Sequence, residues 1–304
     1  MMKLYKLLRK QTVIVGLTIA VLISVAGCVQ EAAMKNETVR EQSQAPDEGV
    51  QNEENNGVTI NRVDFSGNFN GINGCAVLFD FKDNQYSVYN EGLAVMQASP
   101  YSTFKIISAL MGIHADVIES QASTMNYNGT QYPVPEWNDN LSLDKAFNTS
   151  CVWFFRQVID AVGEGSVQQG LEELQYGNCD ISEWRGSGAN GMEELNGFWL
   201  NSSLKISPME QVQVLSAIFE GESIYSANEV IILKDIMYIE DVNGKKIYGK
   251  TGTGADGEAW FVGFAEKNDE REYFAIYLND NNQSETVSGN AAKAIAIEII
   301  HYIR

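Results

Sequence analysis

Histidine and cysteine are scarce in this chain, which has two histidines and four cysteines among its 304 residues. The histidines, His114 and His301, lie far apart in the sequence, and no Cys-x-x-Cys motif occurs. Zinc sites in proteins are built mainly from clustered histidine and cysteine side chains. We therefore expect no metal cofactor.

The few cysteines also exclude a disulfide framework. Apart from Cys28 near the N-terminus, the chain has Cys75, Cys151 and Cys179, which allow at most one internal disulfide. The sequence leaves open whether Cys151 and Cys179 are bonded to each other.

Basic residues are few as well, with 21 Lys and Arg against 40 Asp and Glu and a formal net charge of -19. Such a chain is repelled by phosphate backbones, so we expect no nucleic-acid partner. Its 44% hydrophobic content is enough to bury one large core or two interlocked lobes.

Long hydrophobic runs are absent except near the N-terminus. Basic residues between Lys3 and Lys10 precede an uncharged apolar run from about Thr12 to Val25. This plan is typical of a secretory signal, and the run is shorter than the ~20 residues that span a bilayer comfortably. The alternative is an uncleaved membrane anchor.

Residues 25–28, Val-Ala-Gly-Cys, resemble a bacterial lipobox. The resemblance implies that residues 1–27 are removed as a lipoprotein signal peptide and that Cys28 carries a lipid. The protein would then be extracytoplasmic and anchored to the cell membrane through that lipid.

Residues 28–57 are polar, acidic and nearly free of large apolar side chains, so we expect a disordered tether there. Residues 58–304 would form the folded domain. An antiparallel hairpin is predicted from residues 75–81 and 85–89, both rich in aromatic and β-branched residues.

Further elements follow from the spacing of apolar residues. They are helices over residues 143–162, 166–174 and 208–219, a glycine-rich loop over 176–197, strands over 246–252, 258–265 and 272–278, and a last helix over 288–304. We expect an α/β (α+β) fold in which an antiparallel sheet is built from both chain ends. Helices would flank this sheet, a helical lobe would be inserted at about residues 111–225, and a cleft would lie where the two parts meet.

Ser102 and Lys105 stand at the start of an apolar helical pattern, with Pro100 in its first turn. Residues three apart share one face of a helix. Burial and the positive helix N-terminus should lower the pKa of Lys105 and leave a neutral amine beside a hydroxyl. Such an amine can take the serine proton, and N–H groups at the helix start can stabilise an oxyanion.

The Ser-x-x-Lys spacing alone is weak evidence, because it recurs at Ser142/Lys145 and at Ser202/Lys205. Only the Ser102 motif precedes a helix that is apolar on all sides, whereas Ser142 fits a helix N-cap. A capped helix start followed by a surface lysine is the alternative for Ser102 as well.

Two more motifs follow in chain order, Ser150-Cys151-Val152 and Lys250-Thr251-Gly252. Motifs of these kinds accompany a nucleophilic serine in penicillin-binding proteins and class A β-lactamases, although valine here replaces the usual asparagine at the third place. Singly, Ser150 could bond to its own helix and Lys250 could lie in a turn. Their order on suitable elements favours one joint site.

With Tyr176-Gly-Asn178 and the run from Phe198 to Pro208, these motifs resemble class D (OXA-type) serine β-lactamases over about residues 60–304. After the class D enzymes, the chain most resembles the penicillin-sensor domains of the BlaR and MecR receptors. The resemblance implies hydrolysis of the β-lactam amide through a serine acyl-enzyme, which gives resistance to penicillins. The alternative is a β-lactam sensor or penicillin-binding protein that acylates without rapid deacylation.

The resemblance also implies catalytic roles. Ser102 would be the nucleophile and Lys105, carrying a carbamate derived from CO2 or bicarbonate, the general base, with no other cofactor. Ser150 would relay a proton to the lactam nitrogen, assisted by Lys250.

Supporting roles are implied in the same way. Phe104 and Val152 would keep the lysine pocket apolar, and the indole N–H of Trp199 would bond the carbamate. Alternatively, Trp199 is only a core residue.

The Lys-Thr-Gly strand would bind substrate through Thr251, Gly252 and Lys250, while the backbone N–H groups of Ser102 and Thr253 form the oxyanion hole. Many class D enzymes have an arginine near the last helix for the substrate carboxylate, but residues 288–293 contain none. Carboxylate binding would then depend on Thr251 and Lys250. The sequence gives no oligomeric state.

Overall fold

The computed structural model describes residues 52–55, 58–254 and 256–302, and the account below refers to these. The expected signal peptide, Cys28 and the tether up to residue 51 lie outside them. Within the described ranges, no helix is both long enough and apolar enough to cross a membrane.

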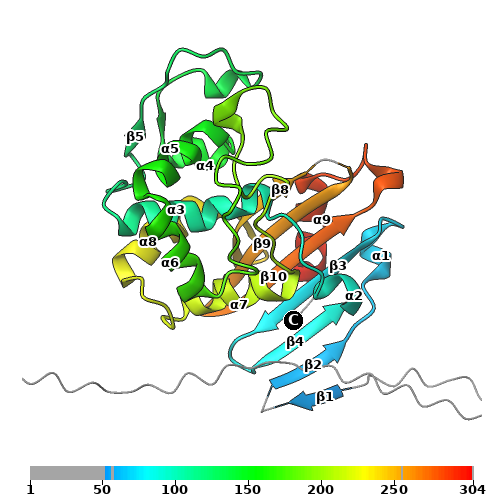
Figure 1. Cartoon of the computed structure of the whole chain (residues 1–304). Helices are drawn as coiled ribbons and strands as arrows, with labels where there is room; N and C mark the ends of the chain where they lie inside the picture. The colour runs from blue at the N-terminus through cyan, green and yellow to red at the C-terminus, as the bar shows by residue number, and fades with distance from the viewer. Residues whose placement is uncertain (1–51, 56–57, 255, 303–304) are drawn as a thin grey trace, which may run out of the picture. The chain divides into compact units, whose positions relative to one another are not determined.

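The described residues form a large sheet whose central pair of strands comes from opposite ends of the chain (Figure 1). Its eight strands lie in the order β1-β2-β4-β3-β10-β9-β8-β7. They are β1 (Asn52–Asn55), β2 (Val58–Arg62), β3 (Gly74–Asp80), β4 (Gln85–Tyr89), β7 (Tyr238–Val242), β8 (Lys245–Thr253), β9 (Glu258–Lys267) and β10 (Glu270–Asn279). Antiparallel pairing of β3 with β10 confirms a sheet built from both chain ends.

Two expectations about the sheet are wrong in part. The β2–β4 pair is parallel, so the sheet is mixed rather than antiparallel throughout. Since β3 lies between β4 and β10, β2 joins the outer edge of β4, where its chain direction makes it parallel. The tether predicted through residue 57 also ends earlier, because Asn52–Asn55 pair with β2 as β1.

Helices fill the middle of the sequence, as the apolar spacing predicts, and one covers the sheet at its end. They are α1 (Ser66–Phe69), α2 (Glu91–Ala94), α3 (Lys105–His114), α4 (Leu143–Asn148), α5 (Val152–Val162), α6 (Glu164–Leu174), α7 (Pro208–Phe219), α8 (Ala227–Met237) and α9 (Gly289–Tyr302). Short 3-10 turns include η1 (Tyr101–Phe104), and a small sheet pairs β5 (Thr124–Met125) with β6 (Leu141–Ser142).

The single helix predicted over residues 143–162 is wrong. It is divided into α4 and α5, and Ser150 between them has a left-handed backbone with φ of 56°. The helix α8 and the edge strand β7 are absent from the predicted elements.

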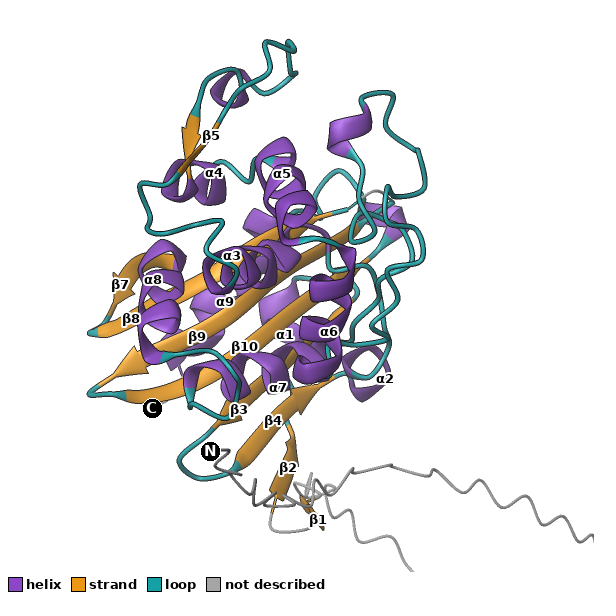
Figure 2. Ribbon diagram, turned by 60° about the vertical axis from the view of Figure 1, so that its left-hand side comes forward, coloured by secondary structure: helices purple, strands orange, loops and turns teal. Residues whose placement is uncertain are grey.

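Two hydrophobic cores lie on opposite faces of the sheet, as the alternation along β3 demonstrates. Cys75, Val77 and Phe79 belong to the larger core, which contains the buried faces of α3, α5 and α7. Ala76 and Leu78 belong to the smaller core, with the buried side chains of α9. Figure 2 shows α9 behind the sheet and α3 in front of it.

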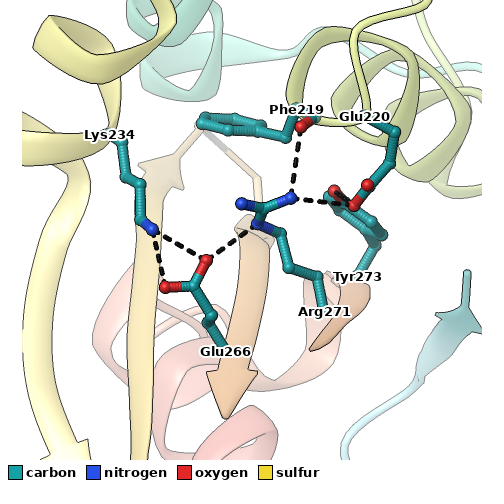
Figure 3. Close-up of polar contacts among 6 residues, drawn as sticks. All are labelled: Phe219, Glu220, Lys234, Glu266, Arg271 and Tyr273. Atoms are coloured by element: carbon teal, nitrogen blue, oxygen red, sulfur yellow. Dashed lines mark hydrogen bonds and ion pairs between the residues drawn. The ribbon is translucent and has the colours of Figure 1, made fainter. Parts of the chain in front are cut away.

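An ion-pair network joins the helical region to the sheet away from the Ser102 and Lys250 motifs (Figure 3). Lys234 of α8 lies 2.6 Å from Glu266 of β9, and Arg271 of β10 donates to the same carboxylate at 2.8 Å. Arg271 also donates to Glu220 at 3.1 Å and to the Phe219 carbonyl at the end of α7. The network therefore ties α7 and α8 to the two longest strands.

Candidate active site

Ser102 and Lys105 are in contact at the junction of η1 and α3. The Nζ atom of Lys105 lies 2.7 Å from the Oγ atom of Ser102, and Lys105 is 0% exposed. Burial first, and the nearby charge of Lys250 second, hold the pKa of Lys105 well below its usual value, while Cys151 acts in the opposite direction. The lowered pKa of this amine, next to the Ser102 hydroxyl, agrees with the expectation from the sequence.

The other two Ser-x-x-Lys motifs have different environments. Ser142 is the N-cap of α4, and its hydroxyl accepts a bond from the backbone N–H of Lys145. Lys205 donates to Ser99 at 2.8 Å, while Ser202 donates to Glu183. Neither motif forms a serine–lysine side-chain pair of the kind seen at Ser102.

Ser150 lies at the break between α4 and α5, next to residues that face the buried lysines. Its neighbour Cys151 is buried and close enough to interact electrostatically with Lys105. Within the described part of the chain, Cys75, Cys151 and Cys179 are all free thiols, which answers the question of a Cys151–Cys179 bond. Val152 begins α5 and is partly buried.

Strand β8 brings the Lys-Thr-Gly motif against Ser102. A Cβ atom at Gly252 would lie 3.1 Å from the Pro100 carbonyl and 3.5 Å from the backbone nitrogen of Ser102. Lys250 is 5% exposed, and burial lowers its pKa to about 8. Its ammonium lies 5.6 Å from the ring centre of Phe147 in α4.

The ladder of β8 decides where the Thr253 backbone points. Gly254 N–H donates to the Glu258 carbonyl at 2.8 Å, so residues 254, 252 and 250 are the hydrogen-bonded positions facing β9. Thr253 N–H therefore points to the other edge of β8, the edge beside η1. The Thr253 hydroxyl accepts from Gly289 N–H at 2.9 Å, which fixes the start of α9.

An aromatic cluster lies under the serine turn. Phe104 is fully buried, with its ring centre 5.2 Å from that of Phe198 and 5.5 Å from that of Trp199. The indole nitrogen of Trp199 is buried without a hydrogen-bond partner. A buried N–H donor that is left unpaired is costly, so this atom fits an acceptor absent from the unmodified chain.

Arg156 of α5 is a buried cation that the sequence patterns did not single out. It is 3% exposed, donates to Asp160 and to the Trp184 carbonyl, and lies 5.6 Å from the ring centre of Trp199. The spacing of apolar residues in α5 shows which helix face is buried, but it does not show that an arginine lies on that face. The sequence therefore gave no signal for Arg156.

The Tyr176-Gly177-Asn178 motif has the geometry of a loop support. A Cβ atom at Gly177, where φ is +55°, would lie 1.9 Å from the Lys205 carbonyl. Asn178 donates to the Ser203 carbonyl at 2.9 Å and accepts from Lys205 N–H at 2.9 Å. These contacts join the two loop segments, and the Tyr176 ring centre lies 5.7 Å from that of Phe104.

Comparison with known proteins now connects this geometry to a family. The chain matches the penicillin binding protein transpeptidase domain over residues 42–301. It belongs to that family.

Among the residues described, no group of three or more His, Cys, Asp or Glu side chains could hold a metal ion.

Relatives within the family include both β-lactamases and receptors. The chain is 32% identical to β-lactamase OXA-1 of Escherichia coli over 241 residues, covering 77% of this chain and 86% of that protein. It is 31% identical to the regulatory protein BlaR1 of Bacillus licheniformis over 250 residues, or 80% of this chain. The chain spans only 39% of the length of that receptor.

The solved structures that resemble this chain are of the same two kinds. A class D β-lactamase from Bacillus subtilis has a TM-score of 0.69 and 30% identity, covering 78% of this chain and 94% of that one. The C-terminal domain of the Bacillus licheniformis BlaR penicillin receptor has a TM-score of 0.71 and 30% identity, covering 79% and 95%. The resemblance to class D enzymes and BlaR sensors, and the α/β fold it implies, are confirmed.

Proposed function

We propose that this chain is a class D serine β-lactamase that opens penicillins and related β-lactams through an acyl-enzyme on Ser102. The family supports either hydrolysis or sensing of β-lactams. The observation that carries the proposal is the fully buried Lys105 amine 2.7 Å from Ser102 Oγ. A base in that position makes an ordinary alcohol nucleophilic.

In acylation, Lys105 acts as the base and takes the Ser102 proton while Oγ bonds to the lactam carbonyl carbon. The lactam C–N bond then breaks, and Ser150 gives its proton to the departing nitrogen and takes in its place the proton that Lys105 removed from Ser102. Because Lys250 is a buried cation near Lys105, it favours this transfer electrostatically. In deacylation, water bonds to the same carbon, the Ser102 ester breaks and the serine regains its proton.

Backbone donors stabilise the tetrahedral intermediates. Ser102 N–H lies beside Gly252, and Thr253 N–H points to the same edge of β8. One oxyanion donor is typically worth about 3 kcal/mol of barrier. Thr251 and Lys250 are proposed to bind the substrate carboxylate, with Gly252 leaving room for the strand to approach.

Lys105 is further proposed to carry a carbamate, formed when the amine nitrogen bonds to CO2 and releases a proton. Bound there, it would supply a carboxylate base beside Ser102. Trp199 Nε1 is the unpaired buried donor that fits such an acceptor, and Phe104 and Val152 exclude water. An anionic carbamate on Lys105 would also attract the nearby Lys250 ammonium.

Counting product molecules tests the main proposal. Protein beginning at residue 29 is mixed with a chromogenic cephalosporin, and we expect many products per protein molecule and none from Ser102→Ala. BlaR-like relatives favour the second candidate, a sensor, which would give one product per molecule and a lasting adduct on Ser102. That result would contradict the enzyme proposal.

Labelled bicarbonate tests the carbamate without relying on activity. With ¹³C-bicarbonate, wild type should give a carbamate NMR signal that Lys105→Ala abolishes and Trp199→Phe weakens. Lys105→Ala should also lose turnover, and added bicarbonate should raise it in wild type. Lys145→Ala, in the capped Ser142 motif, is the matched control and should retain both signal and turnover.

We also propose that Cys28 is lipidated after removal of residues 1–27, which anchors the domain outside the cell at the membrane. Labelled palmitate should enter the wild-type protein but not Cys28→Ser. Expression in a susceptible bacterium should raise the penicillin concentration that stops growth. Labelling that persists in Cys28→Ser would contradict the anchor.

A further inference from the structure

The residue before the nucleophile has an unusual backbone. Tyr101 has φ of 49°, in the left-handed region that non-glycine residues rarely adopt and that costs free energy to maintain. Its N–H donates to the Trp199 carbonyl at 3.0 Å, and the residue is 4% exposed. The surroundings therefore impose this conformation, and with it the direction of Ser102.

The Tyr101 ring packs against the other side of the proposed oxyanion hole. A Cβ atom at Gly254 would lie 2.3 Å from Tyr101 Cζ, so only glycine permits this contact. Gly254 directly follows Thr253, and Ser102 directly follows Tyr101. The Ser102 and Thr253 N–H groups are therefore each one residue away from the same contact, the one between the Tyr101 ring and the Gly254 backbone.

Glu258, at the start of β9, holds the hydroxyl of that ring. Its carboxylate accepts from Tyr101 Oη through Oε2 and from Tyr277 Oη at 2.6 Å through Oε1. Tyr277 is fully buried on β10 and also accepts from Asn279 at 3.2 Å. The Glu258 carbonyl itself accepts the Gly254 N–H, so one residue anchors both the ring and the strand beneath it.

A second bond fixes the same segment from the other side. Trp260 Nε1 donates to the Ser99 carbonyl at 3.0 Å, and the Trp260 ring centre lies 4.2 Å from that of Tyr277. The segment before Ser102 is therefore attached to β9 both before and after Pro100.

We propose that Glu258 is a positioning residue that, through Tyr101, sets the separation of the Ser102 and Thr253 amides. The inference rests on the proposed acylation of Ser102 and adds two residues to it. Both tyrosines remain donors, since burial first and the Glu258 bond second raise the pKa of each. Loss of the Tyr101 bond would free the strained turn and misalign the two amides.

The test compares Tyr101→Phe and Glu258→Ala with a matched control. Tyr273→Phe also removes a tyrosine–glutamate bond, the 2.5 Å contact with Glu220, but in the ion-pair network of Figure 3. For the two test variants we expect the acylation rate constant to fall roughly tenfold, as small misplacements of reacting groups do. The apparent dissociation constant of the first, noncovalent complex should stay near the wild-type value.

A boronic acid that forms a tetrahedral adduct on Ser102 gives the second readout, because it places an oxygen in the oxyanion hole. Its affinity should fall by the same factor in Tyr101→Phe and Glu258→Ala, remain nearly unchanged in Glu258→Gln, which can still bond both tyrosines, and remain unchanged in Tyr273→Phe. Equal boronate affinity in Tyr101→Phe and wild type would overturn the inference. If wild type itself forms no Ser102 adduct, the proposed function fails instead.

Discussion

At the scale of single residues, two buried amines near one serine are the feature that costs stability and that the proposed chemistry requires. Lys105 and Lys250 are both nearly inaccessible, and burial is the leading cause of the lowered pKa of each. The folded protein would be more stable with an apolar side chain of similar size at either position. Packing does not explain why lysine is present at both positions, whereas the proposed function does.

Replacing Lys250 by methionine should therefore stabilise the protein while reducing turnover. The folded pKa of about 8 lies below the usual 10.5, so the unfolded chain binds more protons between these values and wild-type stability rises across this window. The advantage of Lys250→Met should be about 3 kcal/mol below pH 8 and should shrink toward zero by about pH 10.5.

Urea unfolding of wild type and Lys250→Met at several pH values between 7 and 10.5 measures this advantage. Lys145→Met, at an exposed position in α4, is the control and should give a nearly constant difference. A Lys250→Met advantage that stays constant or grows with pH would show that the buried ammonium is not its cause.

The sequence predicted the residues of the site better than their interactions. Ser102, Lys105 and Lys250 could be found because each lies in a short contiguous motif, and burial of Lys105 follows from the apolar residues around it. Tyr101 and Glu258 could not be found in this way, since they are 157 positions apart and meet only through the pairing of β8 with β9.

At the scale of elements, the break between α4 and α5 matters most for the site. Residues 143–162 have a nearly continuous helical pattern, which hides the left-handed backbone of Ser150. A left-handed conformation in one residue does not alter the apolar spacing on either side, so the pattern predicted one helix. Because of this break, the backbone of Ser150 lies outside both helices.

The Ser150→Gly variant should separate the effect of the strained backbone from the effect of the hydroxyl group at this break. Glycine adopts positive φ without strain, so we expect stability to rise by about 1 kcal/mol. Turnover should nevertheless fall at least about 100-fold, the typical contribution of a positioned proton-transfer group.

Thermal unfolding and steady-state kinetics on the same samples measure both effects. Ser150→Ala is the comparison, since it loses the hydroxyl but keeps the strain and should match Ser150→Gly in activity only. Full turnover in both variants would remove Ser150 from the proposed mechanism.

Local patterns account for much of the remaining fold. The β3–β4 hairpin and the strands β8, β9 and β10 were predicted because aromatic and β-branched residues are concentrated in them. Strand β7 was missed because its side chains are mostly exposed and include Glu240 and Asp241. The parallel β2–β4 pair depends on which sheet edge remains free, and no segment of sequence encodes that by itself.

At the scale of the described domain, the network of Lys234, Glu266, Arg271 and Glu220 connects the helices to the sheet (Figure 3). Arg271 is its centre because it contacts both carboxylates and the end of α7. Removing it would leave Glu220 without this cation at a site where the carboxylate is only 17% exposed.

Arg271→Leu should cost about 2 kcal/mol or more, less than the full cost of breaking a deeply buried pair because the site is partly solvated. Lys82→Leu, which breaks the exposed pair with Glu270, is the control and should cost under about 1 kcal/mol. Chemical denaturation measures both, and the acylation rate of Ser102 below the unfolding transition should be unaffected. Equal costs would mean that the network does not hold the helices to the sheet.

The pairing of β3 with β10 has a consequence for how the protein is made. Residues almost 200 positions apart, such as Val77 and Ala275, must meet before the middle of the sheet exists. Contacts so distant form slowly, and here they cannot form until the residues of β10 have been synthesised. A nascent chain therefore contains Ser102 for some time before Lys250 has been added, so the proposed site cannot be assembled during that interval.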